Sequence, residues 1–348
     1  MNDIISNQTI ERVKRDNCFD FLRYLFAFSL ILVHFCTLTG TEQFWFISGQ
    51  MRVKAFFTIT GFLVVYSYIR RKTLKVYCWK RILRIIPAYF TTILLCYILG
   101  YFFSTANILE YYCSSQSLKY LMANLSFMNF IEPCLPGLFT DNLYGPFVNG
   151  SLWSMKLEII FYIFVPFMIW LMRKYNKMYV ILTIFAFNTI FHAVLNYLDN
   201  NNGSSIYHTI NNSSPTTMIY FFSGTTLLLY FNWFCKHIKW TFSCCLIYVI
   251  VTLIFDYSLF YYLEPLAFSG VIVGIAYFCK PLNILRKYDN ISYGLYLYHF
   301  PVIQVLVQYR LHQYNIYITF ILTILITVIL AIISWYLLEK PMLKMKIS

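Results

Sequence analysis

Charged residues are scarce in this chain, and acidic residues are the scarcest of them. Of 348 residues, 12% are charged and only 14 are Asp or Glu, whereas 59% are hydrophobic and 21% are aromatic. This composition excludes a soluble globular domain, and repeated apolar runs of about 20 residues predict membrane helices. No polar segment is long enough for a separate soluble domain, so we expect residues 1–348 to form a single membrane-embedded domain.

The sequence also lacks the signals of several other protein classes. Residues 1–18 have no apolar run of the kind found in a cleavable signal peptide, so the first span is expected to act as its own signal. The ten cysteines form no CxxC pair and no Cys/His spacing suited to zinc, and we predict no metal site. Cys113 and Cys134 share one long loop and could form a disulfide if that loop lies in an oxidising compartment.

The net charge of +13 does not indicate a nucleic-acid partner, because the basic residues cluster in short loops that alternate along the chain. The fold class expected from this pattern is an all-α integral membrane bundle of about ten transmembrane helices with both termini cytoplasmic. The loop 70–84 carries seven basic residues and is expected in the cytoplasm, whereas 104–149 and Leu198–Pro215 have the composition of outer loops. The ten spans are expected at about 19–39, 50–69, from after Arg84 to about 103, 150–172, 178–198, 216–235, a seventh that ends near Phe255, 262–279, 289–309 and 315–338.

The first span, DFLRYLFAFSLILVH, holds Asp20, Arg23 and His34 within an otherwise apolar helix. Ionisable groups in a span cost free energy, so by default they face a protein interior or a wet cavity and mark a functional path. Arg23 and His34 are eleven residues apart, which places them on nearly the same helix face about 16 Å apart along the axis. A histidine there can take a proton from an attacking hydroxyl. The alternative roles are a hydrogen-bonded packing histidine and an arginine that reaches the lipid headgroups.

Two further motifs lie within the second span and in the cytoplasmic basic loop just before the third. Gly61 after Thr60 in FFTITGFLVV lets a backbone or a narrow ligand approach closely, and helix packing by small residues is the explanation favoured for this motif taken alone. Arg81 and Arg84 share a helix face at the membrane surface and could grip phosphates, while topology and anionic lipid are the alternative explanation for most of the basic loop.

The fourth and ninth spans each carry one polar candidate. Glu158, about two turns into NGSLWSMKLEIIFYIFVP, is costly in a span unless it is paired or lies in a cavity, and Trp153 is either an interfacial anchor or a substrate platform. His299 in DNISYGLYLYHFP stands just before Pro301, so it is either a site residue or a structural one that bonds carbonyls freed around the proline.

In their order along the whole chain, these segments resemble the bacterial acyltransferase family 3 membrane proteins, multi-span enzymes that O-acylate extracytoplasmic glycans. The segments that carry the resemblance are DFLRYLFAFSLILVH, FFTITGFL, RILRIIPAYF, NGSLWSMKLE, ISYGLYLYHFP and the terminal Glu339-Lys340-Pro341. By resemblance, the family's first-span Arg and His fall on Arg23 and His34, and its paired arginines fall on Arg81 and Arg84.

Two other sequence elements of the family match this chain, each with some residues replaced. The SGFL element falls on residues 60–63, with Thr60 in place of Ser. The LWSLSVEEQFY element falls on Leu152 to Tyr162, where Glu158 matches the first Glu. The second Glu and the Gln are replaced by Ile159 and Ile160, and Lys156 stands where a small residue is usual. These departures leave the role of the fourth span open. The appended hydrolase-like domain of some members is not expected.

The resemblance implies a membrane O-acyltransferase that transfers an acetyl group from acetyl-CoA to a sugar hydroxyl of a cell-surface polysaccharide or its lipid-linked precursor, at the bacterial inner membrane. Donor binding is assigned to Arg81, Arg84, Thr60 and Gly61, catalysis to His34, Arg23 and Glu158, and substrate contact to Trp153 and His299. The expected partners are acyl-CoA, the glycan acceptor and membrane lipid. The sugar, the acyl chain, the way the acyl group crosses the membrane and the oligomeric state are left open.

Two other functions fit part of this pattern. A transporter or flippase would use the buried charges as a translocation path, although no internal repeat of the inverted-repeat transporters is obvious. A glycan polymerase or glycosyltransferase would present paired carboxylates or a metal site in a large outer loop. The loop 104–149 offers Glu110, Glu132 and Asp141 without paired spacing, which counts against that function.

Overall fold

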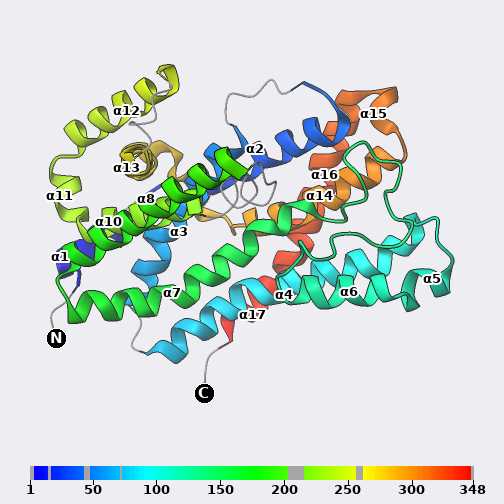
Figure 1. Cartoon of the computed structure of the whole chain (residues 1–348), viewed down its shortest axis with the longest axis horizontal. Coiled ribbons are helices and arrows are strands. Elements are labelled where there is room, and N and C mark those ends of the chain that lie inside the picture. Colours follow the sequence, from blue (N-terminus) through cyan, green and yellow to red (C-terminus); the bar gives the residue numbers. More distant parts are fainter. Residues whose placement is uncertain are drawn as a thin grey trace. The chain divides into compact units, whose positions relative to one another are not determined.

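The computed structural model describes residues 4–14, 17–42, 48–70, 73–202, 215–255 and 262–345, and named helices account for most of them (Figure 1). Arg71 and Lys72 of the basic loop, and residues 203–214 of the predicted outer loop, lie outside the described residues. The chain forms two compact units. The expectation of a single domain stays a prediction.

The first unit comprises residues 1–23, 50–74 and 161–288, and the second comprises 24–49, 75–160 and 289–348. Helices of the first unit are α1 (Asn7–Lys14), α3 (Gly49–Ile69), most of α7 (Met155–Lys174), α8 (Lys177–Asn202), α10 (Pro215–Leu229), α11 (Phe231–Lys236), α12 (Ile238–Ile254), α13 (Glu264–Phe278) and η4 (Lys280–Lys287). The second unit holds most of α2 (Phe19–Thr39), then α4 (Leu74–Gly100), η1 (Tyr101–Phe103), α5 (Ile108–Cys113), α6 (Ser115–Leu125), η2 (Gly150–Ser154), α14 (Ser292–Gln308), α15 (Leu311–Tyr314), α16 (Ile316–Ser334), η5 (Trp335–Glu339) and α17 (Lys340–Lys344).

Six helical segments in the described part of the chain are long and apolar enough to cross a membrane. They are Phe19–Thr39, Gly49–Ile69, Leu74–Phe103, Gly150–Lys174, Lys177–Asn201 and Ile316–Lys344. Helices α10, α12, α13 and α14 occupy the other predicted positions with 15, 17, 15 and 17 residues, fewer than the roughly 20 that a bilayer requires. The structure therefore supports a helical membrane protein, while the count of ten and the side of each terminus stay predictions.

In the first unit, α3 and α10 touch through two glycines. A Cβ built on Gly61 would lie 2.0 Å from the carbonyl oxygen of Phe221, and one built on Gly224 would lie 2.2 Å from that of Thr58. Helix α10 also packs against α8 and α13, and α13 packs against α12 (Figure 1). The two glycines therefore allow the backbones of α3 and α10 to touch, as expected where transmembrane helices associate.

The second unit is organised around α2, α14 and α16. Ala27, Ile31, Phe35 and Leu38 recur every three or four residues along α2, so they form one helix face. Ala27 and Ile31 pack in a cluster with Leu295 and Ala331, and Phe35 and Leu38 in a second cluster with Phe300, Ile303 and Val307. The face of α2 that is buried on α14 is thus continuous, and His34 lies beside it.

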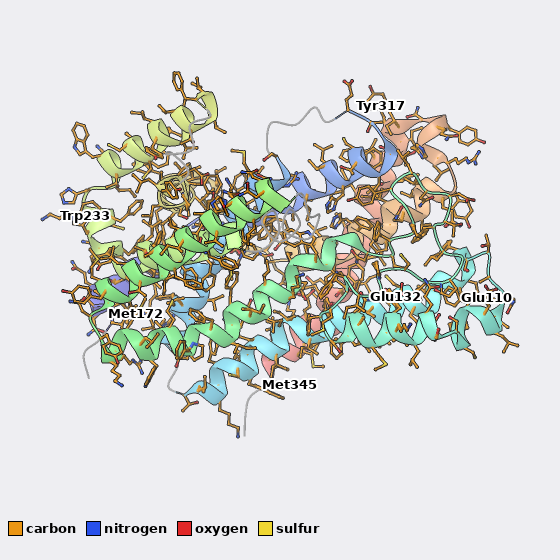
Figure 2. All side chains as sticks on the ribbon, in the orientation of Figure 1. Glu110, Glu132, Met172, Trp233, Tyr317 and Met345 are labelled. Carbon is orange, nitrogen blue, oxygen red and sulfur yellow. The ribbon has the colours of Figure 1, made fainter. Side chains whose placement is uncertain are left out.

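The segment between α6 and η2 is tied to α14 by the buried Gln304. Its amide nitrogen donates to the carbonyls of Gly145 and Phe147 at 3.1 and 2.9 Å, and its amide oxygen accepts from Asn142 at 2.8 Å. Glu110 on α5 and Glu132 after α6 stand apart in Figure 2 and do not form a carboxylate pair. Cys113 and Cys134 are both free thiols.

Replacing Gly61 with alanine should destabilise the first unit, because the new Cβ meets a backbone atom of α10 that no side-chain rotation can move. We expect a loss of about 1–3 kcal/mol in the free energy of unfolding, the range found for overpacked cores, measured by unfolding of the purified protein in detergent. Thr60→Ala, at a half-buried neighbour on the same helix, is the control and should unfold close to the wild type. Equal stability of the two variants would contradict the close approach of α3 and α10.

Candidate active site

Arg23 lies in the first turns of α2, in the part of this helix that belongs to the first unit. Its Nη1 donates to Oδ1 of Asp20 at 3.4 Å, and both side chains are 30% exposed. The carboxylate stands in the first turn of the helix, where the helix dipole favours a negative charge. Asp20 therefore orients Arg23, a role that its i,i+3 spacing allowed but that our sequence analysis did not assign.

In the second unit His34 meets His299. Nδ1 of His34 lies 2.7 Å from Nε2 of His299, and the ring planes differ by only 9° with their centres 5.0 Å apart. The edge of Phe300 packs against the His34 ring at an interplanar angle of 81°. His299 is fully buried and His34 is half-buried. The structure thus joins two sequence-predicted site residues that are 265 positions apart.

Pro301 lies inside α14 and leaves the carbonyl of Leu297 without its usual helical donor. That carbonyl accepts a hydrogen bond from the side-chain amide of Asn149 at 2.8 Å. His299 instead bonds the carbonyl of Leu295 through Nδ1 at 3.0 Å. The structural role considered for His299, bonding the carbonyl freed by Pro301, is therefore taken by Asn149.

Arg84 stands over two aromatic rings. Its guanidinium carbon is 6.0 Å from the ring centres of Tyr293 and of Trp335, at the outer limit for a cation–π contact. Glu339, only 1% exposed, interacts electrostatically with Arg84. Arg81, one turn earlier, stands 5.7 Å from the ring centre of Tyr77. Both arginines are half-buried on α4, which keeps them partly accessible at this end of the helix.

Glu158 is half-buried at the start of α7, and its carboxylate interacts electrostatically with Tyr293 and Tyr296 of α14. The Tyr296 hydroxyl bonds the carbonyl of Ser151 and lies 3.1 Å from the hydroxyl of Ser154. The hydrogen bonds of Tyr296 thus tie η2 to α14 beside Glu158.

One helix therefore connects the separate parts of the candidate site in the second unit. Tyr293, Tyr296 and His299 follow each other at intervals of three residues on α14, so their backbones span about 9 Å along the axis. Tyr293 faces Arg84 and Glu158, Tyr296 faces η2, and His299 bonds His34. This arrangement makes α14 the support of the candidate site.

The end of α14 that carries Tyr293 is fixed by an ion pair. Lys340 donates to Asp289 at 2.6 Å, which links the DNISYG segment to the terminal Glu-Lys-Pro segment. The Tyr24 hydroxyl also donates to the carbonyl of Asp289 at 2.9 Å and accepts from the amide of Ile291 at 3.0 Å.

The other predicted site residues lie elsewhere. Gly61 is buried against α10 of the first unit, which supports its packing role, and Thr60 beside it is half-buried. Trp153 is half-buried in η2. Their assignments to donor and substrate stay predictions. Among the described residues no group of three or more His, Cys, Asp or Glu could hold a metal ion.

Sequence reasoning missed Tyr293, Tyr296 and Asn149. The two tyrosines precede His299 at intervals of three residues, so the helical period was a usable signal. The role of Asn149 had no local signal, because its partner carbonyl lies 148 positions away.

Known proteins resemble this chain over almost its whole length. An acyltransferase domain model matches residues 16–340. An O-acetyl transferase of Shigella phage Sf6 is 27% identical over 339 residues, covering 94% of this chain and 96% of the relative. Nodulation protein 10 of Rhizobium leguminosarum bv. viciae is 25% identical over 358 residues, covering 95% and 94%. No solved structure matches.

Replacing Asn149 with alanine should destabilise the second unit, because it leaves the buried carbonyl of Leu297 without a donor. An unsatisfied buried group costs about 1–3 kcal/mol, which unfolding of the detergent-purified protein would measure. In a Pro301→Ala background the new backbone amide can bond the same carbonyl, so Asn149→Ala should cost less there. Equal costs in the two backgrounds would contradict the role assigned to Asn149.

Proposed function

The chain belongs to the acyltransferase family, and from that premise we propose that it transfers an acetyl group from acetyl-CoA to a sugar hydroxyl of a surface polysaccharide or its lipid-linked precursor. The observation that carries the proposal is the imidazole pair of His34 and His299. The helix that carries His299, α14, also bears the tyrosines that face Arg84 of α4 and Glu158 of α7. The O-acetyl transferase name of the phage relative supports oxygen as the accepting atom and acetyl as the group.

His34 acts as the general base in this proposal. A hydroxyl is a weak nucleophile, and a base that removes its proton during attack accelerates the reaction by about 10²–10⁴-fold. Histidine suits this role because it gains and loses a proton near neutral pH. Half-burial leaves the ring of His34 accessible to a substrate while its other side is held by His299 and Phe300.

Acetyl-CoA supplies an activated thioester and carries phosphates at its opposite end. Arg84 and Arg81 would bind those phosphates, because guanidinium groups pair with phosphate oxygens in a bidentate way. Arg84 stands over the ring of Tyr293 on α14, the helix that also supports His34, and interacts electrostatically with Glu339. Arg23, on the same helix as His34, is proposed to hold the part of the donor that approaches the thioester.

Glu158 is proposed to contact the acceptor. It lies beside Tyr296 and Ser154, whose hydroxyl groups are the kind that bond sugar hydroxyls. The alternative role, orienting His34, is less favoured because His299 already occupies Nδ1 of that ring. Trp153 in the adjacent η2 helix offers an aromatic face to the same acceptor.

We place this reaction at the bacterial inner membrane, with membrane lipid around the long apolar helices. A transporter or flippase is the competing function, and it requires no thioester donor. Acetyl transfer by purified protein separates the two. Membership of the acyltransferase family favours the enzyme.

Replacing His34 with alanine should abolish acetylation of the surface glycan while the protein remains folded and inserted, because no base is left to accept the hydroxyl proton. Mass spectrometry of glycan from cells that carry each variant would measure this. His192→Ala, at another half-buried histidine on α8, is the matched control and should retain acetylation. Persistent acetylation in His34→Ala would remove the general-base role.

Replacing Arg84 or Arg81 with alanine should raise the KM for acetyl-CoA about 10- to 100-fold, as expected from the roughly 1.5–3 kcal/mol of a hydrogen bond to a charged group. The effect should be much smaller with acetyl-pantetheine, which lacks the nucleotide phosphates. Lys75→Ala, at an exposed basic residue of the same helix, is the control. An equal loss with both donors would place the arginines away from the phosphates.

A further inference from the structure

The hydrogen bond between the two imidazoles is fixed in direction by the backbone carbonyl of Leu295. That oxygen lies 3.0 Å from Nδ1 of His299. A carbonyl only accepts hydrogen bonds, so Nδ1 of His299 carries a proton. Neutral His299 then has a lone pair on Nε2, and this nitrogen accepts a hydrogen bond.

Because Nε2 of His299 accepts a hydrogen bond, it determines the tautomer of His34. Nε2 of His299 is 2.7 Å from Nδ1 of His34, so Nδ1 of His34 must donate. Neutral His34 therefore keeps its lone pair on Nε2. The near-coplanar rings, 9° apart, let this N–H point toward the in-plane lone pair of its partner.

The other protonation states of His299 cost free energy. A proton on Nε2 alone would leave the lone pair of Nδ1 facing the lone pairs of the Leu295 carbonyl across 3.0 Å. Protons on both nitrogens would place a positive charge on a ring that is 0% exposed. The neutral, Nδ1-protonated ring satisfies both contacts without charge.

From this chain of hydrogen bonds we infer that His299 is a positioning residue, which holds His34 in the tautomer whose Nε2 takes the proton of the acceptor hydroxyl. The inference deepens the proposed function and rests on it. It also gives His299 a role different from the substrate contact predicted from sequence, because His299 acts here through His34.

The transfer step balances with these two rings. The acceptor oxygen bonds to the acyl carbon and its proton moves to Nε2 of His34. The carbon–sulfur bond breaks, its electron pair stays on sulfur, and Nε2 returns the proton so that the thiol leaves. While His34 is cationic, its Nδ1–H donates a charge-assisted hydrogen bond to His299. Phe300, packed edge-on against His34 and 3% exposed, limits rotation of the base.

Two variants that differ by one methylene test the inference. The amide of glutamine reaches the position of a histidine Nε2, whereas that of asparagine reaches only the position of Nδ1. His299→Gln should therefore retain an acceptor for His34 and most of kcat. His299→Asn should keep only the contact to Leu295 and lose about 100- to 1,000-fold in kcat, with the KM for acetyl-CoA close to wild type. Thermal unfolding of both proteins checks that they are equally folded.

The outcomes separate this inference from the proposed function. Equal losses in two folded variants, or no loss in either, would overturn the positioning role. Absence of acetyl transfer by the wild type would instead count against the proposed function.

A second measurement does not depend on activity or on the folding of a His299 variant. In wild-type protein labelled with ¹⁵N-histidine, the His34 signals, identified by their loss in His34→Ala, should show a protonated Nδ1 and an unprotonated Nε2. A proton on Nε2 of neutral His34 would overturn the inference.

Discussion

One hydrogen bond, 2.7 Å long, joins imidazoles of α2 and α14, and the function proposed for this protein depends on it. A polar pair among apolar side chains is stable only when each of its groups has a hydrogen-bond partner. A buried polar group without a partner destabilises the fold by more than a formed hydrogen bond stabilises it. The Leu295 carbonyl supplies another hydrogen-bond partner for His299. The surrounding face of Ala27, Ile31 and Leu295 holds the two helices close enough for the rings to meet.

Helix α14 can support the site because its proline does not break it. Asn149 takes the carbonyl that Pro301 leaves without a donor, so the helix continues from Ser292 to Gln308. The segment before η2 is thereby part of the support of His299, although it lies far away in the sequence. The NGSLWS and LYHFP segments are thus joined by the hydrogen bond from Asn149 to the carbonyl of Leu297.

Hydropathy alone located the long helices well, because burial in lipid imposes a length and an apolar composition. The first span was expected at about 19–39 and α2 is Phe19–Thr39. His34 and Glu158 could be singled out from the sequence because ionisable residues are unusual within apolar runs, and Arg84 because it shares a helix face with Arg81. His299 was also singled out, but its pairing with His34 was not predicted, because a contact between residues 265 positions apart leaves no pattern in local spacing. The sequence also left two roles open for Gly61. A small residue is needed both where another helix packs closely and where a ligand approaches closely.

Gln304 holds the loop beyond α6 through the main-chain carbonyls of Gly145 and Phe147 and the side chain of Asn142. Leu143 and Tyr144, between these anchor points, are 73% and 48% exposed. Anchoring through the backbone is insensitive to the identity of the intervening side chains. Substitutions at the tip of this loop therefore leave intact the hydrogen bonds that attach the loop to α14.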